Sequence, residues 1–150
     1  MINCEQEIAS AVIRLGLGSS QISKCEPAEA MRVARLTQSQ FVVDDPRVWW
    51  LGFQALYETV PYGSSDDWAR RLNALIPLGT DRCMLICDCE RDDYLVYEVA
   101  VGVVTSLLSE CSFFEYYLVD PEFRWIIADT DHNQFLLARS AQGRESESRE

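Results

Sequence analysis

His132 is the only histidine in the chain, and it stands in the run Asp131-His132-Asn133, close to Asp129. A neighbouring carboxylate orients an imidazole and raises its pKa, so His132 could act as a general base beside Asp129 and Asp131. One open interpretation is therefore a small hydrolase or a metal-dependent enzyme that uses these three residues. The other is a simple turn, in which His132 faces solvent and has no chemical role.

The remaining motifs fall short of catalytic or metal-binding patterns. A zinc protease of the His-Glu-x-x-His type needs two histidines. The run from Asp129 to Asn133 begins like a calcium-binding loop, but Gln134 and Ser140 occupy the positions that need glycine and glutamate. Residues 16–24 are not a phosphate-binding loop, because Lys24 does not follow a glycine. We therefore predict no catalytic residues, no metal site and no cofactor.

The charge balance restricts the choice of partner. The chain of 150 residues has 13 Lys and Arg against 24 Asp and Glu, which gives a net charge of −11. Residues 81–131 contain 12 of the acids and 3 of the bases. Nucleic-acid binding depends on neutralising phosphates with Lys and Arg, so we predict no nucleic-acid partner. A strongly negative surface either steers a basic protein into contact or serves solubility alone.

The N-terminal residues and the cysteines indicate a cellular compartment. Residues 1–7 are acidic, whereas a secretory signal begins with basic residues and continues with an unbroken apolar run. No apolar run reaches the ~20 residues needed to cross a bilayer. We therefore expect a cytoplasmic protein without a membrane span, and in that compartment its six cysteines should be reduced thiols.

Apolar spacing predicts helices in the first half of the chain. Residues 4–15 place apolar side chains on one helical face, and Gly16 then ends the helix. Residues 54–61 fit either a helix or a strand, and we prefer the strand because they are rich in strand formers. The same reasoning predicts helices at residues 27–36, 46–53 and 64–75 and a brief strand at 41–43.

The second half of the chain has the pattern of consecutive hairpins. Two apolar segments flank the polar residues 90–93, which is typical of a β-hairpin. Later apolar segments are separated by tight turns, and such short connections favour an antiparallel meander because parallel strands need long crossovers. The predicted elements are strands at residues 83–88, 94–99, 113–119, 123–128 and 134–138, with a helix at 101–110.

Together these elements predict an α+β fold, in which an antiparallel sheet of about five or six strands has helices packed on one face. Residues 1–139 should form a single domain, since a chain of this length can bury one ordinary core. Residues 140–150 contain one apolar residue, Ala141, and we expect them to form a flexible C-terminal tail. No oligomeric state follows from the sequence.

The acidic excess falls on the predicted hairpins, so we expect a negative sheet surface that also exposes aromatic side chains. Tyr and Trp are frequent anchors of protein interfaces. We predict contacts with a basic protein partner from Asp88, Glu90, Asp92, Asp93, Glu115, Tyr117, Trp125, Asp129, Asp131 and His132.

The C-terminal half of the chain resembles known proteins. The runs Phe113-Phe114-Glu115-Tyr116-Tyr117-Leu118-Val119-Asp120, Arg124-Trp125-Ile126-Ile127 and Asp131-His132-Asn133 together resemble a bacterial domain family of unknown function. Over residues 47–137 the chain is similar, more distantly, to the SUKH superfamily of immunity proteins. Asp131 stands where that pattern tends to have a second histidine.

The resemblance implies an α+β fold without catalytic residues, in cytoplasmic bacterial proteins that bind and neutralise toxins, often nucleases. A negative surface would complement a basic nuclease. We therefore expect a non-enzymatic protein-binding domain, and a bacterial immunity protein that neutralises a toxin is its most specific form.

Overall fold

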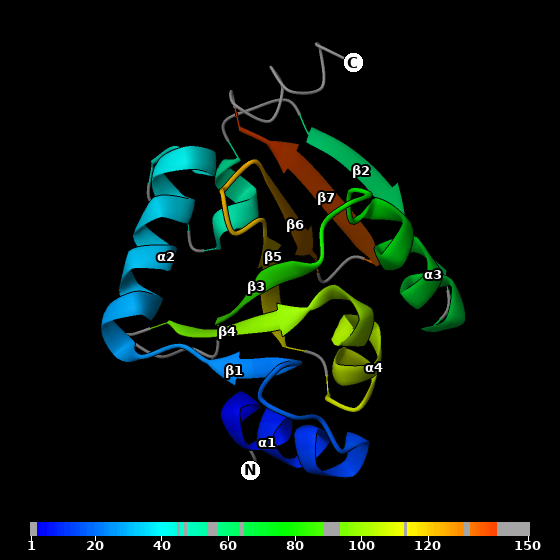
Figure 1. Cartoon of the computed structure of the whole chain (residues 1–150). Helices are drawn as coiled ribbons and strands as arrows, with labels where there is room; N and C mark the ends of the chain where they lie inside the picture. Colours follow the sequence, from blue (N-terminus) through cyan, green and yellow to red (C-terminus); the bar gives the residue numbers. More distant parts are fainter. Residues whose placement is uncertain are drawn as a thin grey trace.

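A seven-stranded antiparallel sheet organises the chain (Figure 1). The computed structural model describes residues 3–44, 46, 48–53, 57–63, 65–88, 94–112, 114–130 and 133–140. Within them the strand order is β1-β4-β3-β5-β6-β7-β2. The strands are β1 (Ile22–Lys24), β2 (Tyr57–Pro61), β3 (Arg82–Asp88), β4 (Leu95–Ala100), β5 (Glu115–Val119), β6 (Trp125–Asp129) and β7 (Gln134–Arg139). The predicted α+β class and antiparallel pairing are confirmed.

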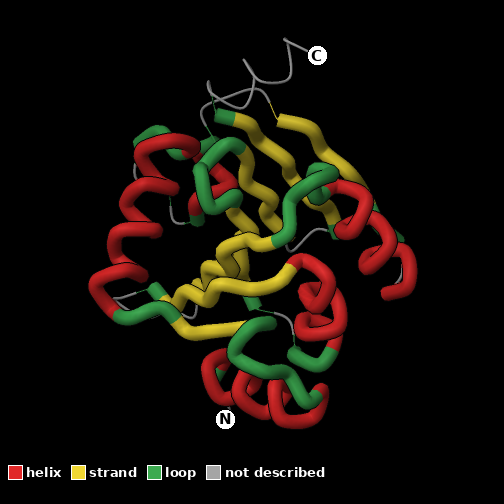
Figure 2. Tube along the Cα trace, viewed as in Figure 1, coloured by secondary structure: helices red, strands yellow, loops and turns green. Residues whose placement is uncertain are grey.

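Helices cover both faces of this sheet. They are α1 (Cys4–Leu15), α2 (Pro27–Phe41), α3 (Ser65–Leu75) and α4 (Val104–Ser109), with 3-10 turns η1 (Trp49–Gly52) and η2 (Val101–Val103). One core joins α1, α3 and α4 to the sheet, and the other joins α2 and η1 to its opposite face. Figure 2 shows α2 on one side of the strands and α3 and α4 on the other.

The coverage of both faces differs from the prediction of helices on one face. The neighbours Leu85 and Ile86 in β3 show the cause, because they point to opposite faces and belong to different cores. Both are at most 1% exposed. Such a strand is a continuous apolar run without alternation, which is typical of a strand buried on both faces, so the sequence contained a signal against helices on one face only.

The two edge strands of the sheet are the ones that the sequence did not predict clearly: one segment fitted either a helix or a strand, and the other strand was not predicted. Residues 57–61 form strand β2, which pairs with β7 from Tyr57–Ala138 to Pro61–Gln134. Pro61 is tolerated there because an edge strand needs hydrogen bonds on one side only. At the other edge, β1 pairs with β4 over three residues. A strand of that length has too few residues to show an alternating pattern, so the sheet has one strand more than predicted.

The helix predictions hold in part. Helix α1 has the predicted bounds, a capping box at Asn3 and a left-handed Gly16 with φ of 66°. Helix α2 continues to Phe41, beyond the predicted end at residue 36, because Ala34, Thr37 and Phe41 extend its buried face. The predicted strand at 41–43 is reduced to a bridge between Val42 and Phe53. Residues 49–52 form a 3-10 turn in place of the predicted helix.

Two smaller predictions need correction. The predicted tail begins one residue too early, because Ser140 is 3% exposed and its N–H donates to the carbonyl of Arg124 at 3.0 Å. Residues 141–150 lie outside the described part. Cys25, Cys83, Cys87 and Cys111 are free thiols as expected, but Cys4 is disulfide-bonded. Among the described helices, none combines the length and the apolar character that a membrane span requires.

Candidate functional site

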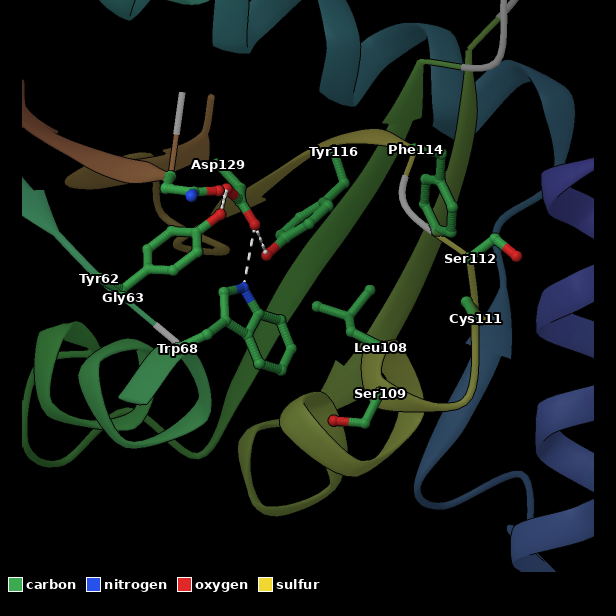
Figure 3. Close-up of a pocket in the computed structure, with 11 residues that line it drawn as sticks. Tyr62, Gly63, Trp68, Leu108, Ser109, Cys111, Ser112, Phe114, Tyr116 and Asp129 are labelled. Atoms are coloured by element: carbon green, nitrogen blue, oxygen red, sulfur yellow. Dashed lines mark hydrogen bonds between the residues drawn. The ribbon is translucent and has the colours of Figure 1, made fainter. Parts of the chain in front are cut away.

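A cavity of about 340 Å³ opens between helices α3 and α4 at the end of strand β6 (Figure 3). Its volume lies at the lower end of the range for small-molecule pockets, about 300–1,000 Å³. It is lined by Tyr62, Gly63, Trp68, Leu108, Ser109, Cys111, Ser112, Phe114, Tyr116, Asp129 and Asn133. Aromatic rings therefore supply much of the wall, and exposed polar residues such as Ser109 and Asn133 stand at the rim.

The sheet places Asp129 and Tyr116 beside one another. Asp129 is the last residue of β6, and Tyr116 lies in the neighbouring strand β5. The pair Tyr117–Ala128 fixes the register one step further along these strands. Because alternate residues share a face, Tyr116 and Asp129 both point toward the core formed with α3 and α4.

Helix α3 brings Trp68 to the same point. Leu72, one turn after Trp68, is fully buried and seats the helix on the sheet. The start of α3 is fixed by Asp67, whose carboxylate accepts the N–H of Gly63 at 3.0 Å. This local bond is one reason that the pKa of Asp67 is lowered, together with its ion pairs to Arg70 and Arg71. The indole of Trp68 is therefore held over the end of β6.

Tyr62 completes the group from the connection between β2 and α3. Its backbone N–H donates to the carbonyl of Asn133 at 3.0 Å, and its ring packs on Phe135 with centroids 4.8 Å apart. Both contacts tie the connection to the start of β7. The Tyr62 hydroxyl then lies against Asp129, as Figure 3 shows.

Three donors converge on the Asp129 carboxylate, which is 2% exposed. Tyr62 Oη donates to Oδ1 at 2.6 Å, while Trp68 Nε1 and Tyr116 Oη donate to Oδ2 at 3.0 and 2.9 Å. Burial raises the pKa of Asp129, and the three hydrogen bonds oppose that rise because they favour the ionised form. Burial and the nearby carboxylate also raise the pKa values of Tyr62 and Tyr116, so both hydroxyls remain protonated donors.

A second buried aspartate shows what is unusual about Asp129. Asp120 is also 2% exposed, but it pairs with a guanidinium, since Arg124 Nε lies 2.6 Å from its Oδ2. The hydrogen bonds to Asp129 all come from neutral groups, and no cationic side chain of the described residues forms an ion pair with it. The negative charge at the base of the cavity is therefore solvated by the protein but not neutralised.

Cys111 is a possible nucleophile in the lining of the cavity, but its thiol is not ionised at neutral pH. Burial raises the pKa of Cys111 to about 11, so the thiol stays protonated at neutral pH. Its Sγ lies 3.5 Å from the carbonyl of Leu107. The backbone N–H of Ser112 donates to Glu7 at 2.9 Å. No hydrogen bond joins these two residues to Asp129 in the described part of the chain.

The described residues among those predicted to contact a partner lie in different surroundings. Asp88 and Glu115 lie directly opposite each other at the ends of β3 and β5, and both are half-buried. Tyr117 and Trp125 are 1% and 4% exposed and belong to the two cores. Asp129 is 2% exposed and lines the cavity. The other predicted residues, Glu90, Asp92, Asp93, Asp131 and His132, lie outside the described residues.

Tyr117 and Trp125 are therefore corrections to the predicted set, because side chains packed between the sheet and its helices cannot touch a partner. Tyr117 packs on Trp49 with ring centroids 5.0 Å apart. The predicted acidic sheet face is likewise wrong for the described residues, since helices cover both faces. Their exposed acids lie at helix ends, in turns and in the edge strand β2, as with Glu110 beside Arg14 and Glu58 beside Arg139.

Sequence analysis missed most of the residues around Asp129. Tyr62, Trp68, Phe114 and Tyr116 have no motif in common, and the spacing of Trp68 indicates only that it shares a helical face with Leu72 and Leu75. One signal was available, because Phe114 and Tyr116 alternate along a strand and so share a face. Whether that face points toward Asp129 follows only from the register of β5 against β6, which the sequence does not give.

Comparisons with protein-family models, with curated proteins and with solved structures give no match. Within the described residues, no three His, Cys, Asp or Glu side chains are grouped so that they could hold a metal ion.

Proposed function

We propose that this chain is a non-enzymatic protein-binding domain that recognises a basic protein partner. The observation that carries the proposal is that most of the described basic side chains form ion pairs with acidic side chains of the same chain. Eight described basic side chains form ion pairs with acids of the same chain, namely Arg14, Lys24, Arg32, Arg70, Arg71, Arg82, Arg124 and Arg139. These pairs cancel charge locally and leave the excess of −11 on the remaining acids.

A chain with this balance offers little to a phosphate backbone, because it has few cations and eight of those described already form ion pairs with its own acids. A basic protein brings the missing positive charge and is steered by the long-range field. The resemblance to the SUKH superfamily suggests a toxin as that protein, which would make the chain an immunity protein. The protonated Cys111 and the three neutral donors that hold Asp129 in place support binding rather than catalysis at the cavity.

The test is capture of a partner and its salt dependence. The immobilised chain is exposed to a lysate of its source organism in low salt, and each captured protein is purified and its Kd measured from about 50 to about 500 mM salt. We expect a basic protein whose affinity falls steeply with salt. A lysate that yields no protein able to bind in purified form, or an affinity independent of salt, would contradict the proposal.

A variant pair refines the capture experiment. Asp88→Asn with Glu115→Gln removes two charges at the end of β3 and β5, where the sequence placed partner contacts. Glu26→Gln with Glu122→Gln removes two exposed charges from distant elements and is the matched control. A surface at the sheet end predicts a larger loss of affinity for the first pair than for the second.

A hydrolase is the second candidate, because residues on both sides of His132 in the sequence line the cavity. Asp129 and Asn133, which flank Asp131 and His132 in the chain, both line the cavity. NMR titration of His132 decides this candidate. A displaced pKa together with hydrolysis of a test ester would support it, and a titration like that of free imidazole would remove it.

A further inference from the structure

The carboxylate and the aromatic rings of the cavity are suited to the cationic side chains of a basic protein partner. We infer that the cavity receives the cationic end of a lysine or arginine side chain of that partner, with Asp129 as its counter-charge and the rings of Trp68, Phe114 and Tyr116 around it. This inference rests on the proposed function, since it names the contact through which a basic protein would be recognised.

The charge at the base of the cavity is the first step of the argument. A buried ionised carboxylate is costly unless it is paired. Asp120 has such a pair in Arg124, whereas Asp129 has only the neutral donors of Tyr62, Trp68 and Tyr116. An entering cation would supply the missing charge. An anionic ligand would add repulsion, and an apolar one would bury the carboxylate further without compensation.

Acceptor capacity is the second step. An ionised carboxylate offers about four acceptor positions, and three of those of Asp129 are used. Among the described residues, Oδ1 accepts from Tyr62 alone, so it retains room for one more donor. The Tyr62 oxygen also keeps acceptor capacity while it donates to Asp129. These positions match the several N–H groups of an ammonium or a guanidinium.

The aromatic walls are the third step. Cations are attracted to the faces of Trp, Tyr and Phe rings, most strongly when water is excluded. Trp68 and Tyr116 are fixed by their hydrogen bonds to Asp129, and Phe114 packs edge-on against Tyr116 with centroids 6.1 Å apart. Figure 3 shows Phe114 and Leu108 on the opposite side of the opening from Asp129 and Tyr62. The rings are therefore in place before a ligand arrives, which lowers the entropic cost of binding.

The test uses capped single amino acids as probes. N-acetyl-lysine amide and N-acetyl-arginine amide carry the cation, while the ε-acetylated lysine derivative and N-acetyl-citrulline amide are neutral analogues of similar shape. The indole N–H resonance of Trp68 reports binding, because this group donates directly to Asp129. We expect at least one cationic probe to shift that resonance saturably with a Kd of about 1 mM, and the neutral analogues to leave it unchanged.

Two substitutions separate charge from structure. Asp129→Asn keeps the size of the side chain and removes its charge, and it should weaken binding of the cationic probe at least tenfold. Asp120→Asn removes the charge of the other buried aspartate outside the cavity and should leave the Kd unchanged. Phe114→Leu removes one wall without touching a hydrogen bond to Asp129, and it should weaken binding several-fold even if Asp129→Asn does not fold.

The outcomes distinguish this inference from the proposed function. Equal binding of cationic and neutral probes, or no shift with either cation, overturns the inference. So does a captured partner that binds wild type and Asp129→Asn equally, although the proposed function then stands. Saturable binding of the cationic probe without any captured protein supports the cation site and removes the proposed function.

Discussion

Replacing Tyr116 with phenylalanine should destabilise the protein, whereas the same change at Tyr117 should not. These tyrosines are adjacent and are 3% and 1% exposed, but they point into different cores. The Tyr116 hydroxyl donates to Asp129 at 2.9 Å, whereas the buried Tyr117 hydroxyl donates to no acceptor among the described residues. The two substitutions remove the same atom, so they differ mainly in the hydrogen bond.

The size of the effect follows from the charge on the acceptor. A hydrogen bond to a charged group contributes about 1.5–3 kcal/mol, and its loss also leaves the buried carboxylate with one donor fewer. Tyr116→Phe should therefore lower the free energy of unfolding by about 1.5–3 kcal/mol, or lower Tm by roughly 3–12 °C for a domain of this size. Tyr117→Phe removes an unsatisfied polar atom and should change the free energy by less than about 0.5 kcal/mol.

Urea unfolding monitored by circular dichroism at neutral pH measures both variants against wild type. Repeating it near pH 3 adds a second check, because protonation of Asp129 removes the charge and should reduce the difference between the two variants. Equal losses at Tyr116 and Tyr117 would refute the assignment of Asp129 as a charged acceptor. A larger loss at Tyr117 would do the same.

Further substitutions and reagents test other parts of the structure. The pKa of Asp129 is raised in the folded state. The free energy of unfolding of wild type relative to Asp129→Asn should therefore be highest below about pH 3.8, and it should fall as the pH rises through the folded-state pKa. Urea unfolding at a series of pH values measures this difference. Leu72→Ala should cost about 2–5 kcal/mol by thermal or urea unfolding, because Leu72 is fully buried and seats α3 on the sheet. Alkylation of Cys111 by iodoacetamide, followed by mass spectrometry, should be slow at pH 8 and accelerate toward pH 11, whereas a rate that levels off near pH 8.5 would contradict its raised pKa.

The elements built from local patterns were the predictable part of the fold. Residues 4–15 combine apolar spacing with a terminal glycine, and helix α1 has those bounds. The β3–β4 hairpin and the β5-β6-β7 meander follow from short polar connections. The end of α2 was not predictable from local pattern. Val42 and Val43 are strand formers, but Phe41 packs in the core against the sheet and the helix therefore continues to that residue.

The cavity depends on contacts that no local pattern contains. Tyr62 and Trp68 lie 67 and 61 positions before Asp129 in the chain, and they reach it only through the placement of β2 and α3. Asp129 itself was selected from the sequence for its position near His132. The structure gives it a different role, as an acceptor beneath aromatic rings.

The position of Tyr62 in the cavity depends on the pairing of strand β2 at the edge of the sheet. In the described part, β2 pairs with β7 alone and most of its residues are exposed. Fraying of this edge would withdraw Tyr62 from Asp129 and leave both cores intact, and such local opening requires less free energy than global unfolding. Occupation of the cavity should therefore slow amide hydrogen exchange along β2 and leave exchange in the central strand β3 unchanged.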